Sequence, residues 1–169
     1  MEDTLHRLAL DSGLVEVTPM KKLRLILLVA SALLFLVPPC ARAGAGWLSD
    51  YKTAQQAAKA GNKFLLIDFT GSDWCGWCKK LDKEILSQSE FKDYARANLV
   101  LLEVDFPRAK LQNADLRKQN QELAQQYQVG GFPTIVVLNG DGQKLWQYDG
   151  YFADGTAAFI AQLEKLRKG

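Results

Sequence analysis

The first 43 residues are patterned differently from the rest of the chain. A short basic segment, residues 20–24, precedes an unbroken apolar run over residues 25–37, and Ala41-Arg42-Ala43 follows that run. This is the three-part pattern of a secretory signal peptide. The apolar run is shorter than the about 20 residues that a transmembrane helix needs. We therefore expect a cleaved leader over residues 1–43, and an uncleaved membrane anchor is the alternative.

Two further features of the leader concern the localisation of the protein. Residues 1–19 add polar length ahead of the basic segment, so Met20 is a candidate for the true start. Cys40 ends the apolar region and is a candidate for lipid attachment, but Pro38 and Pro39 stand where small residues are expected. We expect export, most simply to a periplasm, with the membrane involved through the signal segment only if it is uncleaved.

Apolar positions after the leader alternate between helical and strand-like spacing. Helical spacing predicts five helices, with Ser49 as a candidate N-cap of the first: 47–60, 75–86, 88–97, 115–127 and 157–166. Short apolar or β-branched runs predict four strands: 64–69, 99–105, 134–138 and 144–148.

This order of elements indicates an α/β protein. The first two strands are almost wholly apolar, which is typical of strands buried on both faces of a sheet. Residues 139–142, Asn-Gly-Asp-Gly, predict a hairpin between the last two strands. We expect a single domain over residues 44–169, with a central mixed sheet flanked by helices.

Composition narrows the chemistry. The net charge is +2 with no concentrated basic face, so nucleic acid is not an expected partner. The chain has three cysteines, Cys40, Cys75 and Cys78, and its one histidine, His6, lies in the leader. Zinc needs four ligands, so we expect no metal site, and no cofactor is indicated.

The remaining cysteine pair has the spacing of a redox site. Cys75 stands at the start of a predicted helix, where the partial positive charge of the helix terminus favours a thiolate. Cys78 is one turn further along, close enough for a disulfide with Cys75. Such a pair can exchange two electrons with another dithiol or disulfide through a mixed disulfide. A structural disulfide is the alternative, although closing so short a loop adds little stability.

The combined motifs resemble the thioredoxin superfamily over about residues 47–168. The resemblance rests on a Cys-x-x-Cys after a buried strand and on Phe132-Pro133-Thr134 before a hairpin. With its Gly-Ser-Asp-Trp-Cys lead-in, the chain looks most like exported thioredoxin-like proteins. It is also similar to the C-terminal domain of the bacterial transmembrane disulfide reductase.

The resemblance implies roles for individual residues. Cys75 matches the exposed attacking cysteine and Cys78 the buried resolving one. Pro133 matches a cis-proline whose flanking residues, Phe132 and Thr134, contact substrate. Asp68 matches a buried acid that helps to deprotonate the resolving cysteine, although it lies seven residues before Cys75, one more than in thioredoxin.

Other positions around the motif are expected to contact substrate or depart from the family pattern. Trp74, Gly76 and Trp77 are expected on the substrate-contact surface. The dipeptide between the cysteines lacks the histidine of strong oxidants, which favours a reductant. Leu101 replaces a lysine that thioredoxin keeps near its buried acid. The segment 106–123 is longer than in thioredoxin and forms either a partner-binding edge or an elongated helix.

These observations predict an exported thiol–disulfide oxidoreductase that reduces protein disulfides. Its partners would be protein thiols and disulfides, with a membrane protein as electron donor. Two alternatives remain: a thioredoxin-fold binding or chaperone module without redox turnover, and a disulfide oxidase or isomerase.

Overall fold

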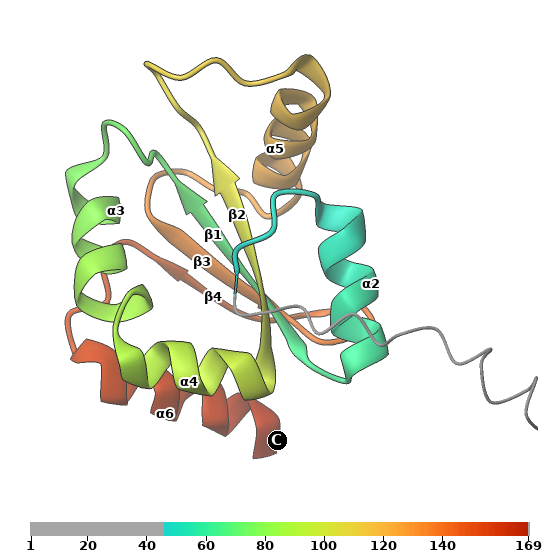
Figure 1. The fold of residues 1–169 in the computed structure, drawn as a ribbon, viewed down its shortest axis with the longest axis vertical. Helices are drawn as coiled ribbons and strands as arrows, with labels where there is room; N and C mark the ends of the chain where they lie inside the picture. Colours follow the sequence, from blue (N-terminus) through green and yellow to red (C-terminus); the bar gives the residue numbers. More distant parts are fainter. Residues whose placement is uncertain (1–45, 169) are drawn as a thin grey trace, which may run out of the picture. The chain divides into compact units, whose positions relative to one another are not determined.

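The structure, a computed structural model, describes residues 46–168. Its elements run in the order α2 (Tyr51–Gly61), β1 (Phe64–Thr70), α3 (Gly76–Leu81), the π-helix η1 (Asp82–Leu86), α4 (Ser89–Asn98), β2 (Leu99–Asp105), α5 (Ala114–Gln126), β3 (Thr134–Leu138), β4 (Lys144–Asp149) and α6 (Gly155–Lys168) (Figure 1). The predicted leader, residues 1–43, lies outside the described residues. None of the helices over 46–168 is both long enough and apolar enough to span a membrane.

The four strands form one mixed sheet in the order β2-β1-β3-β4. β1 runs parallel to β2 and antiparallel to β3, and β3 pairs antiparallel with β4. As predicted, β1 is central, and its seven residues are buried except for the half-buried Phe64 at its start. The predicted hairpin connects β3 to β4, and the Asn139 N–H donates to the Gln143 carbonyl oxygen across it at 3.0 Å.

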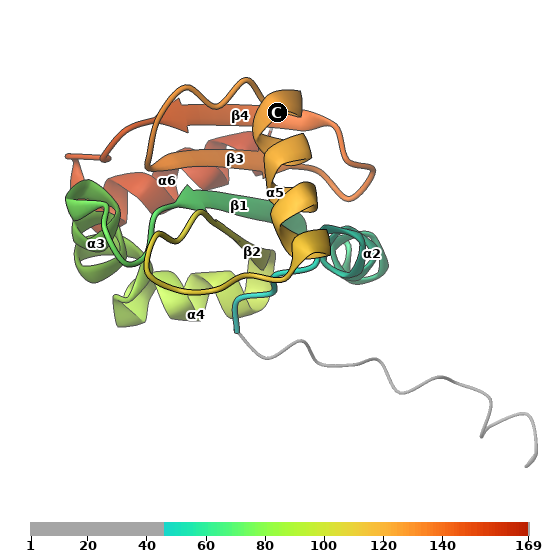
Figure 2. The ribbon, with the colours of Figure 1, turned by 90° about the horizontal axis from the view of Figure 1, so that it is seen from above.

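Two hydrophobic cores lie on opposite faces of the sheet because successive strand side chains point to opposite faces. α2 and α5 cover one face, and α3, η1, α4 and α6 cover the other (Figure 2). β1 contributes to both cores: Leu65, Ile67 and Phe69 face α2 and α5, whereas Leu66 faces the second set of helices. Asp68 shares the face of Leu66, so this carboxyl group points towards the side that α3 covers.

The start of the domain differs from the prediction. Trp47 and Leu48 were expected in the first helix, but Leu48 forms a parallel β-bridge with Leu102. The N-cap is Asp50, not Ser49, and its carboxylate accepts from the Thr53 N–H at 2.7 Å. Apolar Trp47 and Leu48 gain more from packing at the edge of β2 than from extending a helix, which the sequence alone did not reveal.

The helix after the cysteine motif also differs in detail. It begins at Gly76 with Cys75 as its cap, and its last turn, η1, is a π-helix. The Ser87 N–H donates to the Asp82 carbonyl oxygen at 2.7 Å, and the Ser87 hydroxyl donates to the Asp82 carboxylate at 2.9 Å. This double contact accounts for the wider turn that separates α3 from α4.

Candidate active site

The two cysteines of the motif are joined in a disulfide at the start of α3. Their Cα atoms lie 5.3 Å apart. The Cys78 N–H points at the Cys75 sulfur from 3.1 Å, so Cys75 occupies the capping position of the helix. After reduction, this N–H and the helix terminus would stabilise a thiolate on Cys75.

The resemblance implied an exposed Cys75, and the structure corrects this for the oxidised state. Cys75 is 6% exposed and Cys78 is 4% exposed, so the two differ little. The reason is geometric: the Cys75 sulfur is turned towards the helix it caps. Gly76 and Trp77, by contrast, lie on the surface, and Trp77 is 58% exposed.

The Phe132-Pro133 turn lies close to this surface. Its peptide bond is cis, the isomer that the resemblance implies. A shallow pocket of about 300 Å³ is lined by Trp77, Phe132, Pro133, Gly150 and Tyr151. The pocket brings together Trp77, Phe132 and Pro133, which were each expected to contact substrate, and it adds Tyr151, which sequence reasoning missed.

Thr134 differs from its neighbours in this turn. Its side chain is fully buried, and its hydroxyl lies 3.0 Å from both the Gly131 carbonyl oxygen and the Asp149 carboxylate. We expected Thr134 to contact substrate. Any such contact has to come from its backbone, because its side chain fastens β3 to the end of β4.

Trp74 is held firmly against the loop that follows β2. Its indole N–H donates to the Phe106 carbonyl oxygen at 2.8 Å, and the Arg108 guanidinium lies over the ring, 3.7 Å from its centroid. Trp74 also meets Phe132 edge to face. Gly71 makes room for this arrangement, since a Cβ atom there would lie 2.6 Å from the indole.

Asp73 also binds the loop that follows β2. Its carboxylate accepts from the backbone N–H groups of Arg108, at 3.1 Å, and Ala109, at 2.7 Å. These bonds hold the pKa of Asp73 below its usual range. The longer segment after β2 therefore folds back onto the motif as a loop before α5 begins. The segment is thus a loop over residues 106–113 followed by α5 and not simply an elongated helix, and a partner-binding role of this edge stays a prediction.

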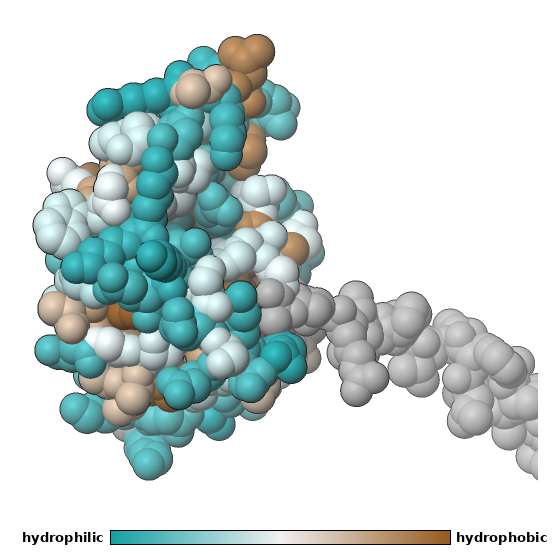
Figure 3. All heavy atoms as spheres, turned by 60° about the vertical axis from the view of Figure 1, so that its left-hand side comes forward, coloured by the Kyte–Doolittle hydropathy of each residue, from teal (hydrophilic) through white to brown (hydrophobic). Residues whose placement is uncertain are grey.

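Trp77 lies in a more open environment than Trp74. Its ring meets Tyr151 at a centroid distance of 5.7 Å, and the Lys80 ammonium lies over both rings. The Tyr151 hydroxyl donates to the Glu84 carboxylate. On the face drawn in Figure 3, hydrophilic residues predominate, and hydrophobic ones lie among them in small groups. Trp77 thus offers an exposed aromatic surface beside the pocket of Phe132, Pro133 and Tyr151.

A second cavity, of about 210 Å³, lies on the inner side of α3. Asp68 and Cys78 both line it, which brings together the acid and the resolving cysteine that the sequence suggested. The carboxyl group of Asp68 is buried, and one of its oxygens has no hydrogen-bond partner among the described residues. Burial raises the pKa of Asp68 to about 8. The extra residue before Cys75 therefore does not turn Asp68 away from Cys78.

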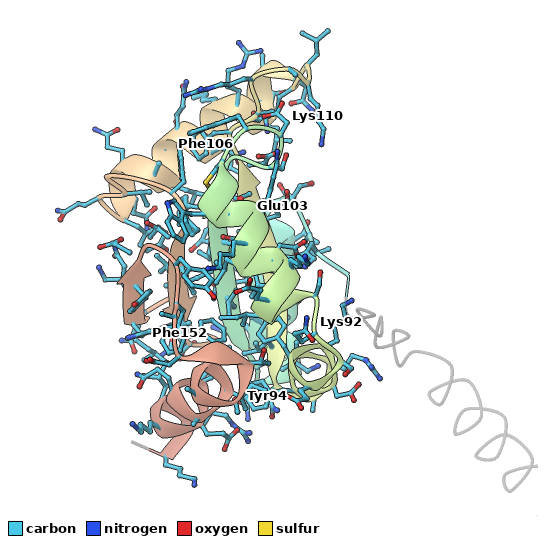
Figure 4. All side chains as sticks on the ribbon, turned by 90° about the vertical axis from the view of Figure 1, so that its left-hand side faces the viewer. Lys92, Tyr94, Glu103, Phe106, Lys110 and Phe152 are labelled. Carbon is cyan, nitrogen blue, oxygen red and sulfur yellow. A yellow bond between two sulfur atoms is a disulfide. The ribbon has the colours of Figure 1, made fainter. Side chains whose placement is uncertain are left out.

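Glu103 and Asp82 also line this cavity, and sequence reasoning missed both. Glu103 is the register partner of Asp68 across the β1–β2 pair. Figure 4 labels Glu103 and Phe106 near the carboxyl end of β2. Burial, followed by the charge of Asp105, raises the pKa of Glu103. A signal was present: Glu103 interrupts an apolar strand just as Asp68 does. Leu101, at the family's lysine position, is buried in the core.

Comparisons with known proteins agree with this geometry. A family model described as a thioredoxin-like domain matches residues 51–167. The disulfide bond reductase DsbH of Chlamydia pneumoniae is 40% identical over 130 residues, which cover 77% of each chain. A solved structure of a DsbH oxidoreductase has a TM-score of 0.68 at 38% identity, covering 78% of this chain and 90% of the other.

A structure with lower sequence identity shares the same fold. The C-terminal domain of Neisseria meningitidis DsbD in its oxidised form has a TM-score of 0.50 at 20% identity, covering 71% of this chain and 98% of that domain. This likeness concerns the fold alone. The family match and the DsbH relative together establish that the chain belongs to the thioredoxin-like family, with a thioredoxin fold and a Cys75–Cys78 pair at the family's redox position.

Proposed function

We propose that this protein is an exported thiol–disulfide oxidoreductase that reduces disulfides in other proteins. The observation that carries the proposal is the Cys75–Cys78 disulfide at the start of α3, next to the cis-Pro133 turn and above the cavity of Asp68. The Chlamydia pneumoniae relative is named a disulfide bond reductase. A structural disulfide would not require either the helix terminus or a buried acid beside it.

The reaction uses the two sulfurs in sequence. The Cys75 thiolate attacks a client disulfide, and the Cys78 thiolate then attacks the resulting mixed disulfide. The products are a client dithiol and the oxidised pair seen here. An external dithiol protein must return two electrons before the next turnover, and a membrane electron donor would fit an exported protein.

The pocket beside the motif supports binding of an extended client segment. The Pro133 carbonyl oxygen already accepts from the Gly150 N–H at 2.7 Å, so within the described residues the backbone of Phe132 is the better placed to pair with a client. A side chain next to the client cysteine would enter the pocket of Trp77, Phe132 and Tyr151. Its lining favours an apolar or aromatic side chain.

Turnover of a disulfide-bonded client tests the activity. Cys75→Ser should abolish reduction, and Lys92→Ala, an exposed change on α4, should leave it intact. Disulfide reduction that persists in Cys75→Ser would overturn the proposal. The direction is tested by equilibrating residues 44–169 with glutathione. A potential near that of thioredoxin, about −270 mV, supports a reductase, and one of about −120 to −180 mV supports an oxidase or isomerase.

The proposed export has its own test. Residues 1–43 would serve as a cleaved signal peptide and residues 44–169 as the mature domain, with a membrane anchor as the alternative. Mass spectrometry of the protein expressed in a Gram-negative host should find a mature N-terminus at Gly44 in the periplasmic fraction. Uncleaved chain in the membrane fraction would favour the anchor, and uncleaved chain in the cytoplasm would contradict export.

A binding or chaperone module is the second candidate, and the exposure of Trp77 favours it. Such a module would hold unfolded peptide on its aromatic surface without redox turnover. The double variant Cys75→Ser/Cys78→Ser separates the two functions. Suppression of client aggregation that survives in this variant would support the binding function, and its loss would leave only the redox function.

A further inference from the structure

Two of the three carboxyl groups that line the cavity behind the active-site disulfide come from neighbouring strands of the sheet. Asp68 on β1 and Glu103 on β2 are register partners in a parallel pair, so their backbones lie about 4.8 Å apart. Both residues follow leucines of the core beneath α3, Leu66 and Leu101, at a spacing of two, which places them on the same face of the sheet. Cys78 lines the cavity that they share.

The other charged groups around this cavity have hydrogen-bond partners of their own, although Asp82 and Asp105 also contribute, after Glu103, to the raised pKa of Asp68. Asp105 accepts from the backbone N–H and hydroxyl group of Ser72, at 2.8 and 2.6 Å. Asp82, on η1, accepts from the Ser87 hydroxyl. The Lys79 ammonium on α3 donates to the Asp73 carbonyl oxygen at 2.8 Å.

The remaining neighbours leave Glu103 as the charge that acts most directly on Asp68. On the β3 side, Asp68 faces the apolar Ile135. Lys110, in the loop after β2, acts on Glu103 and lowers its pKa, against the larger effects of burial and Asp105. Glu103 is half-buried, so its carboxylate retains contact with solvent while it lines the cavity.

We propose that Glu103 is a positioning residue for the resolution step: its carboxylate, next to Asp68 in the cavity behind Cys78, keeps Asp68 basic enough to take the proton of the Cys78 thiol. The inference rests on the proposed function, because it concerns how the mixed disulfide is resolved. It adds a residue to that step for which the family resemblance assigned no role.

In the mixed disulfide, Cys75 is bonded to a client sulfur and Cys78 is a thiol. The Asp68 carboxylate accepts the thiol proton, and the Cys78 thiolate attacks the Cys75 sulfur. The Cys75–Cys78 bond forms, the bond to the client sulfur breaks, and the client leaves as a thiolate that takes a proton from water. Asp68 returns its proton to water in the cavity.

The direction of the effect follows from the charges. After burial, Glu103 is the largest cause that raises the pKa of Asp68. A negative charge nearby disfavours the ionised form of a second carboxyl group, so the two groups titrate as a coupled pair. Removing the charge of Glu103 should lower the pKa of Asp68 and make it a weaker base. A weaker base removes the Cys78 proton less effectively, although it is ionised down to a lower pH.

The experiment uses Ellman's reagent, 5,5′-dithiobis(2-nitrobenzoate), with the reduced full chain in a stopped-flow instrument. Attack by Cys75 releases one nitrothiobenzoate, and resolution by Cys78 releases the second. The rate of the second release is measured from pH 4 to pH 10 for wild type, Glu103→Gln, Glu103→Asp and Asp68→Asn. Glu122→Gln, an exposed change on α5, is the control.

For Glu103→Gln, we expect the acid limb of the profile to move to lower pH by about one unit. The rate on the plateau should fall about threefold. Glu103→Asp, which keeps the charge, and Glu122→Gln should follow wild type, and Asp68→Asn should lose the limb. If Glu103→Gln fails to fold, Glu103→Ser removes the same charge with a smaller side chain and carries the same expectation.

The outcomes separate the inference from the proposed function. An acid limb that depends on Asp68 but is unchanged in Glu103→Gln would overturn the role of Glu103 and leave the oxidoreductase intact. A wild-type protein that releases no second nitrothiobenzoate would overturn resolution by Cys78, and the proposed function with it. A limb that moves equally in Glu103→Asp would show a packing effect and would also reject the inference.

Discussion

The two sides of the Cys75–Cys78 disulfide carry different residues, although α3 supports both. The outer side presents Trp74 and Trp77 with cations lying over their rings, next to a shallow apolar pocket. The inner side is a small cavity with three carboxyl groups. An aromatic surface can hold a client, and a carboxyl cavity can move protons. The difference indicates that client binding and proton transfer are separated by one short helix. Changes on the outer side should therefore affect client binding, and changes on the inner side should affect proton transfer.

Asp68→Asn should give the largest effect and should stabilise the protein. Burial raises the pKa of Asp68 to about 8 in the folded state from 3.8, the ordinary value of an aspartate, so the folded state binds more protons between these pH values. The free energy of unfolding therefore falls as pH rises from about 4 to about 8, and Asp68 destabilises the folded state fully above pH 8. We expect a gain on the order of 5 kcal/mol at pH 8 and almost none at pH 4, measured by urea unfolding. Asp154→Asn, an exposed change, is the control.

Gly71→Ala should be the most damaging change on the outer side. The added Cβ would lie 2.6 Å from the Trp74 indole, which its hydrogen bond and Arg108 hold in place. We expect a loss of about 2 kcal/mol together with a red shift in tryptophan fluorescence. Gly130→Ala is the matched control, since nothing lies within 4 Å of its Cβ position. Equal stability of the two variants would show that Trp74 is not held as described.

Trp77→Ala should affect binding more than stability. The side chain is 58% exposed, so little buried area is lost, and stability should change by less than about 1 kcal/mol. Removing the aromatic wall of the pocket should raise KM for a protein client roughly fivefold, with kcat nearly unchanged. The comparison to make is with Ellman's reagent, for which the variant should react like wild type. A matching loss with both substrates would place Trp77 in the chemistry and not in client binding.

Asp73→Asn should give the smallest effect, confined to the loop after β2. The amide oxygen can still accept, but the charge-assisted bonds to Arg108 and Ala109 are lost. We expect cleavage by trypsin at Arg108 and Lys110 to become about threefold faster, without a change in the unfolding midpoint. Because the folded-state pKa of Asp73 is lowered, the wild-type loop should resist cleavage at pH 5 as it does at pH 7. Wild-type cleavage that accelerates at pH 5 would contradict this.

The sequence predicted the local structure better than the long-range contacts. Residues 64–69 and 134–138 are apolar runs whose burial follows from composition, and residues 139–142 carry their own turn signal, so all three were predicted correctly. Ser49 was wrong as a cap because the choice between Ser49 and Asp50 depends on the bridge of Leu48 to β2.

The residues of the candidate site show the same division between local sequence signals and long-range contacts. Cys75, Cys78 and Pro133 were found from motifs, since their spacing along the chain carries the signal. Glu103 interrupts an apolar strand, but its place beside Asp68 became visible only with the register of β1 against β2. Tyr151 became visible only with the return of the chain after β4. Trp74 and Trp77 look equivalent in sequence, and only the loop that folds back over Trp74 distinguishes them.

Trapping with Cys78→Ser tests the central claim most directly, namely that Cys75 attacks and Cys78 resolves. The reduced variant is mixed with a disulfide-bonded client, and the adduct is identified by non-reducing electrophoresis and peptide mass spectrometry. The account predicts a stable mixed disulfide on Cys75 that dithiothreitol releases and that Cys75→Ser does not form. No adduct in Cys78→Ser, while wild type reduces the same client, would contradict it.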